Sequence, residues 1–73
     1  MSKQFTAIIE REDDGYVASC PALDIASQGN TVAEARINLS EAIELFLETA
    51  SPSEVTRRLK SEVYITQIDI AHV

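Results

Sequence analysis

The sequence predicts an α+β fold: a single, mainly antiparallel sheet of 3–4 strands with a main helix packed on one face, in the order β-β-β-α-α-β. Three observations lead to this prediction. Residues 5–20 alternate in polarity around a turn signal, residues 31–50 have helical periodicity behind a capping sequence, and residues 62–70 are rich in β-branched side chains. At 73 residues the chain fits one domain, 1–73, whose core is thin enough for self-association to extend it.

A hairpin is predicted at the start of the chain. The first strand, residues 5–11, has one wholly apolar face, formed by Phe5, Ala7 and Ile9. The following Asp14-Gly15 predicts a tight turn, because glycine accepts the positive φ that such turns require. Residues 16–20 are then the returning strand. Because proline cannot donate a ladder hydrogen bond, Pro21 either ends this strand or lies on an edge of the sheet.

A short third strand and a long helix should follow. Residues 25–28 are the strand, and Gly29-Asn30 ends it. Thr31 and Glu34 form a capping box, in which each side chain is expected to bind the other residue's amide, and the helix extends to about residue 49. At 100° per residue its apolar stripe faces the sheet and comprises Val32, Ala35, Leu39, Ala42, Ile43, Phe46 and Ala50.

A second capping box, Ser51 with Glu54, predicts a short helix to about residue 60, with Val55 and Leu59 facing inward. Residues 62–70 are expected to be the last strand. Its apolar residues occupy both faces, which favours either a bulge near Gln67 or burial by a second copy or a partner. With helices on one side only, the other face of the sheet has nothing within the chain to cover it.

The charge of the chain limits its partners. Twelve acidic residues against six basic ones give a formal charge of −6, which opposes direct binding to nucleic acid and favours a basic partner. The same surplus could serve solubility alone. The N-terminus has no apolar signal core and no run reaches transmembrane length, so we expect a cytoplasmic protein with no membrane partner.

The residues needed for catalysis are largely missing. The one histidine, His72, is the second-last residue, and the lone Cys20 is predicted to be a small core side chain. Two glycines make no phosphate loop, no Cys/His pairs suit zinc, and Asp13-Asp14-Gly15 fits a turn better than a calcium loop. We therefore expect a protein without enzymatic activity, cofactor or metal.

Three segments together resemble the HicB family: 16–23 (YVASCPAL), 28–35 (QGNTVAEA) and 39–43 (LSEAI). That family has an aromatic residue and alanine in its second strand, then Pro-x-Leu, a Gly-x-Thr helix start and a Glu-Ala pair in the helix. The resemblance covers roughly residues 3–50, and residues 62–70 fit the family's closing strand. The sequence departs from the family pattern in two ways. Asp24-Ile25-Ala26 occupies the place where many members have Pro-Gly-Cys. Many members also have a C-terminal DNA-binding domain, which we do not expect here, so transcriptional autoregulation is in doubt.

The resemblance implies a truncated ribonuclease H-like fold without catalytic acids, which forms a homodimer or higher homo-oligomer. It also implies an antitoxin of a toxin–antitoxin system, which occludes the active site of a small basic mRNA-cleaving HicA-type toxin. Our candidate contact surface comprises Asp13, Asp14 and Tyr16 at the hairpin and Ile37, Glu41, Glu44, Leu45 and Glu48 on the outer helix face. The alternative interpretation of the latter group, which the sequence favours, is an ordinary solvated helix face with two stray apolar residues.

Two other functions stay open at this level. The chain could be an orphan HicB-like domain that only self-associates or acts as an adaptor. It could also be a remnant nuclease of ribonuclease H type, which would cleave RNA or RNA–DNA hybrids with magnesium.

Overall fold

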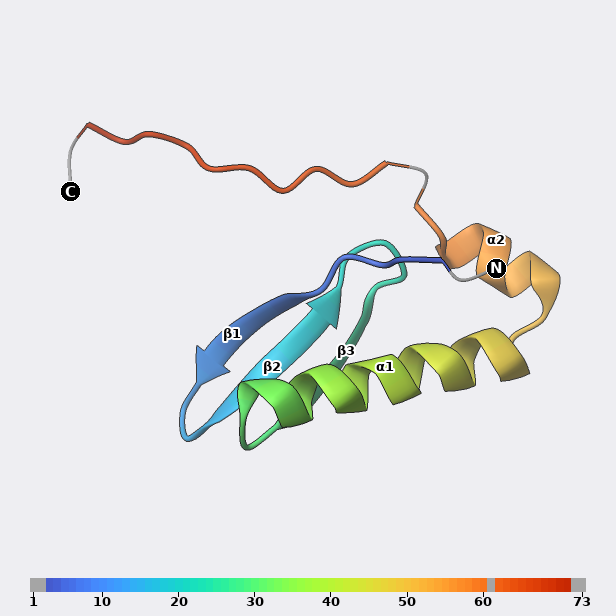
Figure 1. Cartoon of the computed structure of the whole chain (residues 1–73). Helices are drawn as coiled ribbons and strands as arrows, with labels where there is room; N and C mark the ends of the chain where they lie inside the picture. The colour runs from blue at the N-terminus through green and yellow to red at the C-terminus, as the bar shows by residue number, and fades with distance from the viewer. Residues whose placement is uncertain (1–2, 61, 72–73) are drawn as a thin grey trace.

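The computed structural model describes residues 3–60 and 62–71 (Figure 1). Strands β1 (Ile8–Glu12), β2 (Gly15–Cys20) and β3 (Ile25–Gly29) form an antiparallel sheet in the order β1-β2-β3. Helix α1 (Val32–Thr49) packs on one face of this sheet, mainly against β3 and β2, and the short helix α2 (Pro52–Arg58) follows it (Figure 1). The predicted α+β class and the layout of three strands followed by helices are confirmed.

The hairpin between β1 and β2 forms where predicted, but an aspartate rather than the glycine has the positive φ of the turn. Glu12 pairs with Gly15, so the turn consists of two aspartates, and Asp13 has the positive φ of 53°. No glycine has a positive φ among the described residues. Gly15 is needed for another reason: a Cβ atom there would lie 2.9 Å from the backbone oxygen of Gly29, so a side chain would push β3 away.

Five buried side chains form the core: Ala18, Cys20, Leu23, Ala35 and Leu39. Partly buried side chains surround them: Phe5, Ile9, Tyr16, Ala22, Ile25, Ile43, Phe46 and Leu59. The predicted core role of Cys20 is therefore confirmed, as is the inward direction of Leu59.

Two side chains assigned to the core by periodicity are exposed instead. Val32 is 48% exposed; it is the first residue of α1, so no preceding helical turn covers it. Ala7, which precedes β1, is also exposed, although Phe5 and Ile9 of the same predicted face pack against the core.

Both helices begin at the predicted caps, although the glutamates act differently from a capping box. The Glu34 amide donates to Thr31 Oγ1 at 3.0 Å, but the Glu34 carboxylate accepts from the amide of Asn30, one residue earlier than expected. The Glu54 amide likewise donates to Ser51 Oγ at 3.2 Å, while its carboxylate pairs with Arg57 and Arg58.

The predicted closing strand is wrong for the isolated chain. Residues 62–70 form no strand and join no part of the described sheet; they extend away from the folded body (Figure 1). The radius of gyration is consequently 14.3 Å, whereas a compact domain of this length would have about 11 Å. An isolated strand has no ladder hydrogen bonds to stabilise it, so residues 62–70 need a partner edge to become one.

Candidate functional site

A concave, acidic surface lies at the hairpin end of the sheet. The β1–β2 turn, the end of β3 and the start of α1 enclose a pocket of about 450 Å³. Three of the predicted contact residues line it, Asp13, Asp14 and Tyr16. The sequence analysis missed Glu12 and Glu34, which line the same pocket. Glu12 directly precedes Asp13 in the sequence. Glu34, by contrast, joins these acids only through the return of the chain into α1, so its spacing in the sequence carries no signal.

The carboxylates of this hairpin pocket are mostly unengaged. Glu34 accepts from the Asn30 amide, but Glu12, Asp13 and Asp14 make no ion pair or side-chain hydrogen bond within residues 3–60 and 62–71. Among the described residues, the only cation close to the Tyr16 ring is Arg11. Its guanidinium lies 5.8 Å from the centroid of that ring. Tyr16 itself is half-buried and packs against the core, so its ring is a wall of the pocket rather than a projecting anchor.

These acids do not form a metal centre. No group of three or more His, Cys, Asp or Glu side chains in the described ranges is arranged to hold a metal ion. The pocket can therefore offer negative charge to a partner, but its side chains do not converge on one point.

The other predicted contact residues lie on the outer face of α1, away from the hairpin pocket. Ile37 and Leu45 are 54% and 61% exposed, and the three glutamates of this group, Glu41, Glu44 and Glu48, are also exposed. This helix patch is convex, because it lies on the side of α1 that faces away from the sheet. The structure thus separates the candidate residues into two surfaces, a hairpin pocket and a helix patch.

A second hollow lies between the N-terminal segment and the side of α1. Its volume is about 690 Å³, and it is lined by residues 3–7 on one side and by α1 on the other: Arg36, Leu39, Ser40, Ile43, Glu44 and Leu47. We call it the β1-edge groove, since the N-terminal segment leads directly into β1. Of the predicted contact residues only Glu44 reaches it, and sequence reasoning did not identify the groove.

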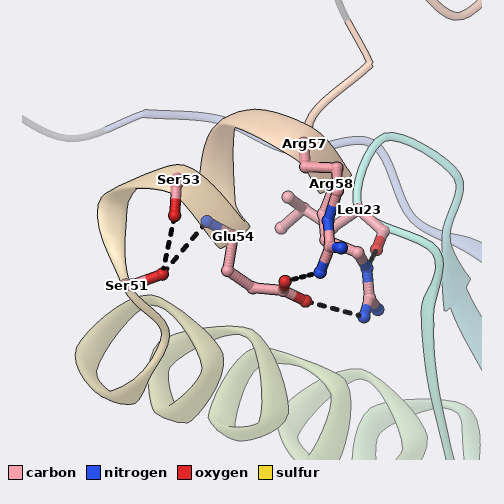
Figure 2. A network of polar contacts seen from close by, with 6 residues as sticks. All are labelled: Leu23, Ser51, Ser53, Glu54, Arg57 and Arg58. Atoms are coloured by element: carbon pink, nitrogen blue, oxygen red, sulfur yellow. Dashed lines mark hydrogen bonds and ion pairs between the residues drawn. The ribbon is translucent and has the colours of Figure 1, made fainter.

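The α2 end of the molecule has the only cluster of basic side chains, and these are engaged (Figure 2). Arg58 donates to the backbone oxygens of Leu23 and Asp24, both at 3.2 Å, and its guanidinium lies 5.1 Å from the centroid of the Phe46 ring. Lys60 Nζ donates to the Pro21 oxygen at 3.1 Å. The cluster therefore fastens α2 to the β2–β3 loop, as a structural role would require, and does not form a free basic patch.

Residues 62–71 expose a row of large side chains. Tyr64, Ile65, Ile68 and Ile70 are 81%, 57%, 77% and 64% exposed, respectively. The Tyr64 hydroxyl donates to the neighbouring Glu62 carboxylate, and this negatively charged acceptor raises the pKa of Tyr64. No helix in the described part of the chain is long and apolar enough to cross a membrane.

Comparison with known proteins gives relatives of one kind. The chain is 39% identical to a UPF0150 protein of Helicobacter pylori over 66 residues, which cover 89% of this chain and 92% of that protein. A UPF0150 protein of Synechocystis is 50% identical over 50 residues, or 66% of this chain and 69% of the relative. A third, from Thermoplasma acidophilum, is 44% identical over 48 residues, or 63% and 70%.

No protein-family model and no solved structure matches the chain. The relatives nonetheless match 69%, 92% and 70% of their own length at identities of 50%, 39% and 44%, respectively. The chain therefore belongs to the UPF0150 family.

Proposed function

We propose that this UPF0150 protein is a non-catalytic antitoxin of the HicB type, which binds a small basic mRNA-cleaving toxin of the HicA type and covers its active site. The observation that carries the proposal is the HicB-like motif in residues 16–23, 28–35 and 39–43. These segments contain every buried side chain of the described residues: Ala18, Cys20, Leu23, Ala35 and Leu39. The resemblance thus rests on core-forming residues, and it supports the type of domain rather than particular contacts.

The distribution of charge supports a basic partner. The hairpin pocket offers carboxylates that have no partner in the described chain, whereas the basic side chains at the α2 end are already bound. A cationic toxin would therefore meet acidic groups that need not break an internal contact first. Opposite charge on the two proteins accelerates their encounter, and salt weakens this effect.

The direct test is inhibition of the toxin. A purified HicA-type toxin is mixed with RNA and increasing amounts of this protein, and cleavage is followed with time. We expect cleavage to fall in proportion to the added protein and to stop near equal concentrations. Unchanged cleavage by an active toxin at a several-fold excess of folded protein would contradict the proposal.

Two matched variants distinguish the candidate surfaces. One neutralises the pocket (Glu12→Gln, Asp13→Asn, Asp14→Asn), and the other neutralises the helix patch (Glu41→Gln, Glu44→Gln, Glu48→Gln). Each removes three negative charges, so the change in net charge is the same. At low salt the variant of the contacting surface should associate with the toxin roughly tenfold more slowly. If the two variants associate at equal rates, the acids act only through overall charge and neither surface is the specific contact.

The nuclease alternative makes a separate prediction. A remnant ribonuclease H-type enzyme would cleave RNA or an RNA–DNA hybrid when magnesium is added to the purified protein alone. We expect no cleavage, since the carboxylates of the hairpin pocket do not converge into a group that could hold a metal. Magnesium-dependent cleavage that a substitution in this chain abolishes would replace the antitoxin proposal.

A further inference from the structure

We propose that the face of the sheet turned away from α1 binds a basic amphipathic helix of the toxin. This inference rests on the proposed function for the identity of the partner, and it adds the surface and the structural element through which the two proteins meet. It follows from a sheet face that no helix of the described chain covers, and from acids on that face that have no counter-charge.

The strands alternate, so that one face of the sheet packs on α1 and the other is open to solvent. Ala18 and Cys20 of β2 are buried in the core beneath α1, and Ile9 and Ile25 pack against them. Their neighbours in each strand therefore point to the opposite side. We call this side the open sheet face; its residues are Ile8, Glu10, Val17, Ser19, Ala26 and Gln28.

The open sheet face has the width and the relief that suit one helix. The strand register places Ser19 between Ile8 and Ala26, and Val17 lies at the centre of the next row. Ile8 and Val17 are half-buried apolar side chains, while Ser19 and Ala26 are short enough to let another backbone approach. Strands about 5 Å apart place the two outer strands roughly 10 Å from each other, which is close to the diameter of a helix.

The charge of the open sheet face favours a basic partner. Glu10 lies on this face and Glu12 continues it at the hairpin end, and neither carboxylate has an ion pair within residues 3–60 and 62–71. The only basic residue in the three strands is Arg11, which points to the α1 side, toward the Tyr16 ring. Glu12 also lines the hairpin pocket, so cations on a docked helix would meet acids from the sheet to the pocket.

The same charges oppose the two other kinds of occupant. Two open sheet faces in contact would bring Glu10 and Glu12 of one copy close to those of the other, and like charges in such a contact are unfavourable. A nucleic acid would meet the same repulsion through its phosphates. A basic amphipathic helix, by contrast, combines an apolar stripe for Ile8 and Val17 with cations along its borders.

The first experiment locates the contact by NMR. Methyl groups of this protein are labelled with ¹³C, and an unlabelled, catalytically inactive toxin is added. We expect shifted signals from Ile8, Val17 and Ala26, and unchanged signals from Ile37 and Leu45, which are exposed on the outer face of α1. The reverse pattern would overturn this inference and leave the antitoxin proposal intact, because the toxin would still bind. No shift at any methyl group, together with uninhibited RNA cleavage, would refute both.

A second experiment identifies the element that the toxin contributes. In an isotope-filtered nuclear Overhauser experiment on the complex, the methyl protons of Ile8 and Val17 report which toxin residues lie against them. A docked helix predicts contacts with toxin residues three or four positions apart. Contacts with every second toxin residue would show a strand in place of the helix and would contradict the proposal.

A pair of charge reversals tests the electrostatic part. Glu10→Lys should weaken toxin binding roughly tenfold at low salt, and less at high salt, because it sets a cation against the basic helix. The matched control is Asp69→Lys, which makes the same change in net charge outside the sheet and should bind within about twofold of the unmodified protein. Both residues are exposed and outside the ion pairs of the described chain, so circular dichroism should show an intact fold. Equal losses of affinity would mean that net charge alone matters and would sink the assignment of the open sheet face.

Discussion

At the α2 end of the molecule the charged side chains are bound to the protein itself, whereas at the hairpin end they are not. Arg58 and Lys60 donate to backbone oxygens of the β2–β3 loop, and Glu54 pairs with both arginines of α2. Glu12, Asp13 and Asp14 have no comparable contact in the described chain. The same kinds of residue therefore stabilise the fold at one end and remain available to a partner at the other.

The difference has a structural origin. The β2–β3 loop contains Leu23, which is fully buried, and Asp24, whose φ of 57° is unfavourable for most residues. Such a loop needs external donors for its carbonyl groups, and the end of α2 supplies them. The β1–β2 turn closes through its own strand pairing from Glu12 to Gly15, so its acidic side chains are not needed for folding.

The largest loss of stability should come from truncating the buried Leu23 side chain at the α2 end. Leu23→Ala is expected to lower the free energy of unfolding by about 2–5 kcal/mol, because the side chain is fully buried and the space it leaves cannot close completely. Urea unfolding followed by circular dichroism measures this change. The control is Leu45→Ala, at a site 61% exposed, which should change stability by less than about 0.5 kcal/mol. Equal losses in both variants would show that the β2–β3 loop is not anchored as described.

The two arginines of α2 form a matched pair for the next comparison. Arg58→Ala loses two bonds to backbone oxygens and the contact with Phe46, and should cost about 1–2 kcal/mol, a figure already reduced for its partial exposure. Arg57 is 74% exposed and contacts only Glu54, so Arg57→Ala should cost less than about 0.5 kcal/mol. Thermal unfolding in low and high salt checks the order. A larger loss of stability in Arg57→Ala than in Arg58→Ala would contradict the conclusion that Arg58 fastens α2 to the β2–β3 loop.

The N-cap of α1 at the hairpin end should contribute less to stability than the buried Leu23 side chain does. Thr31→Ala removes the hydroxyl that accepts from the Glu34 amide and should lower stability by about 1 kcal/mol. Thr31→Ser keeps the acceptor and should restore most of the loss, which equilibrium unfolding of both variants can test. A serine variant as unstable as the alanine variant would mean that the threonine methyl group, and not the cap, is responsible.

The smallest effect on stability is expected from the hairpin acids. Asp13→Asn with Asp14→Asn should change the free energy of unfolding by less than about 0.5 kcal/mol, since neither carboxylate has a partner and asparagine tolerates the positive φ at residue 13. A loss above about 1 kcal/mol would show that these acids stabilise the fold and would weaken the contrast between the two ends.

Local patterns predicted most of the fold. Thr31 and Ser51 cap the two helices, which begin one residue later, and the Asp-Gly signal predicts the hairpin. The stripe through Ala35 and Leu39 faces the sheet. These features depend on residues within about one helical turn or one strand pair of each other, so periodicity and capping preferences are sufficient. Periodicity failed at Val32 and Ala7, because it gives the direction of a side chain but not whether another element covers it.

The candidate site was only partly predictable. The acids of the turn and of the outer helix face were identified from the sequence, but their separation into a pocket and a convex patch was not. Glu34 was missed because it reaches the pocket only through the β3–α1 connection, whereas Glu12 adjoins Asp13 in the sequence and could have been included with the turn acids. The β1-edge groove was missed for the same reason, since its two walls come from residues 3–7 and from α1.

The sequence by itself determined the element types, the caps, the apolar stripe of α1 and the acidic character of the chain, because each is a property of neighbouring residues or of composition. Tertiary structure alone decided which charges are bound and which are free, and that residues 62–70 find no edge within the folded body. Both depend on how distant segments meet: a carboxylate or a strand is satisfied only by a partner placed beside it in space.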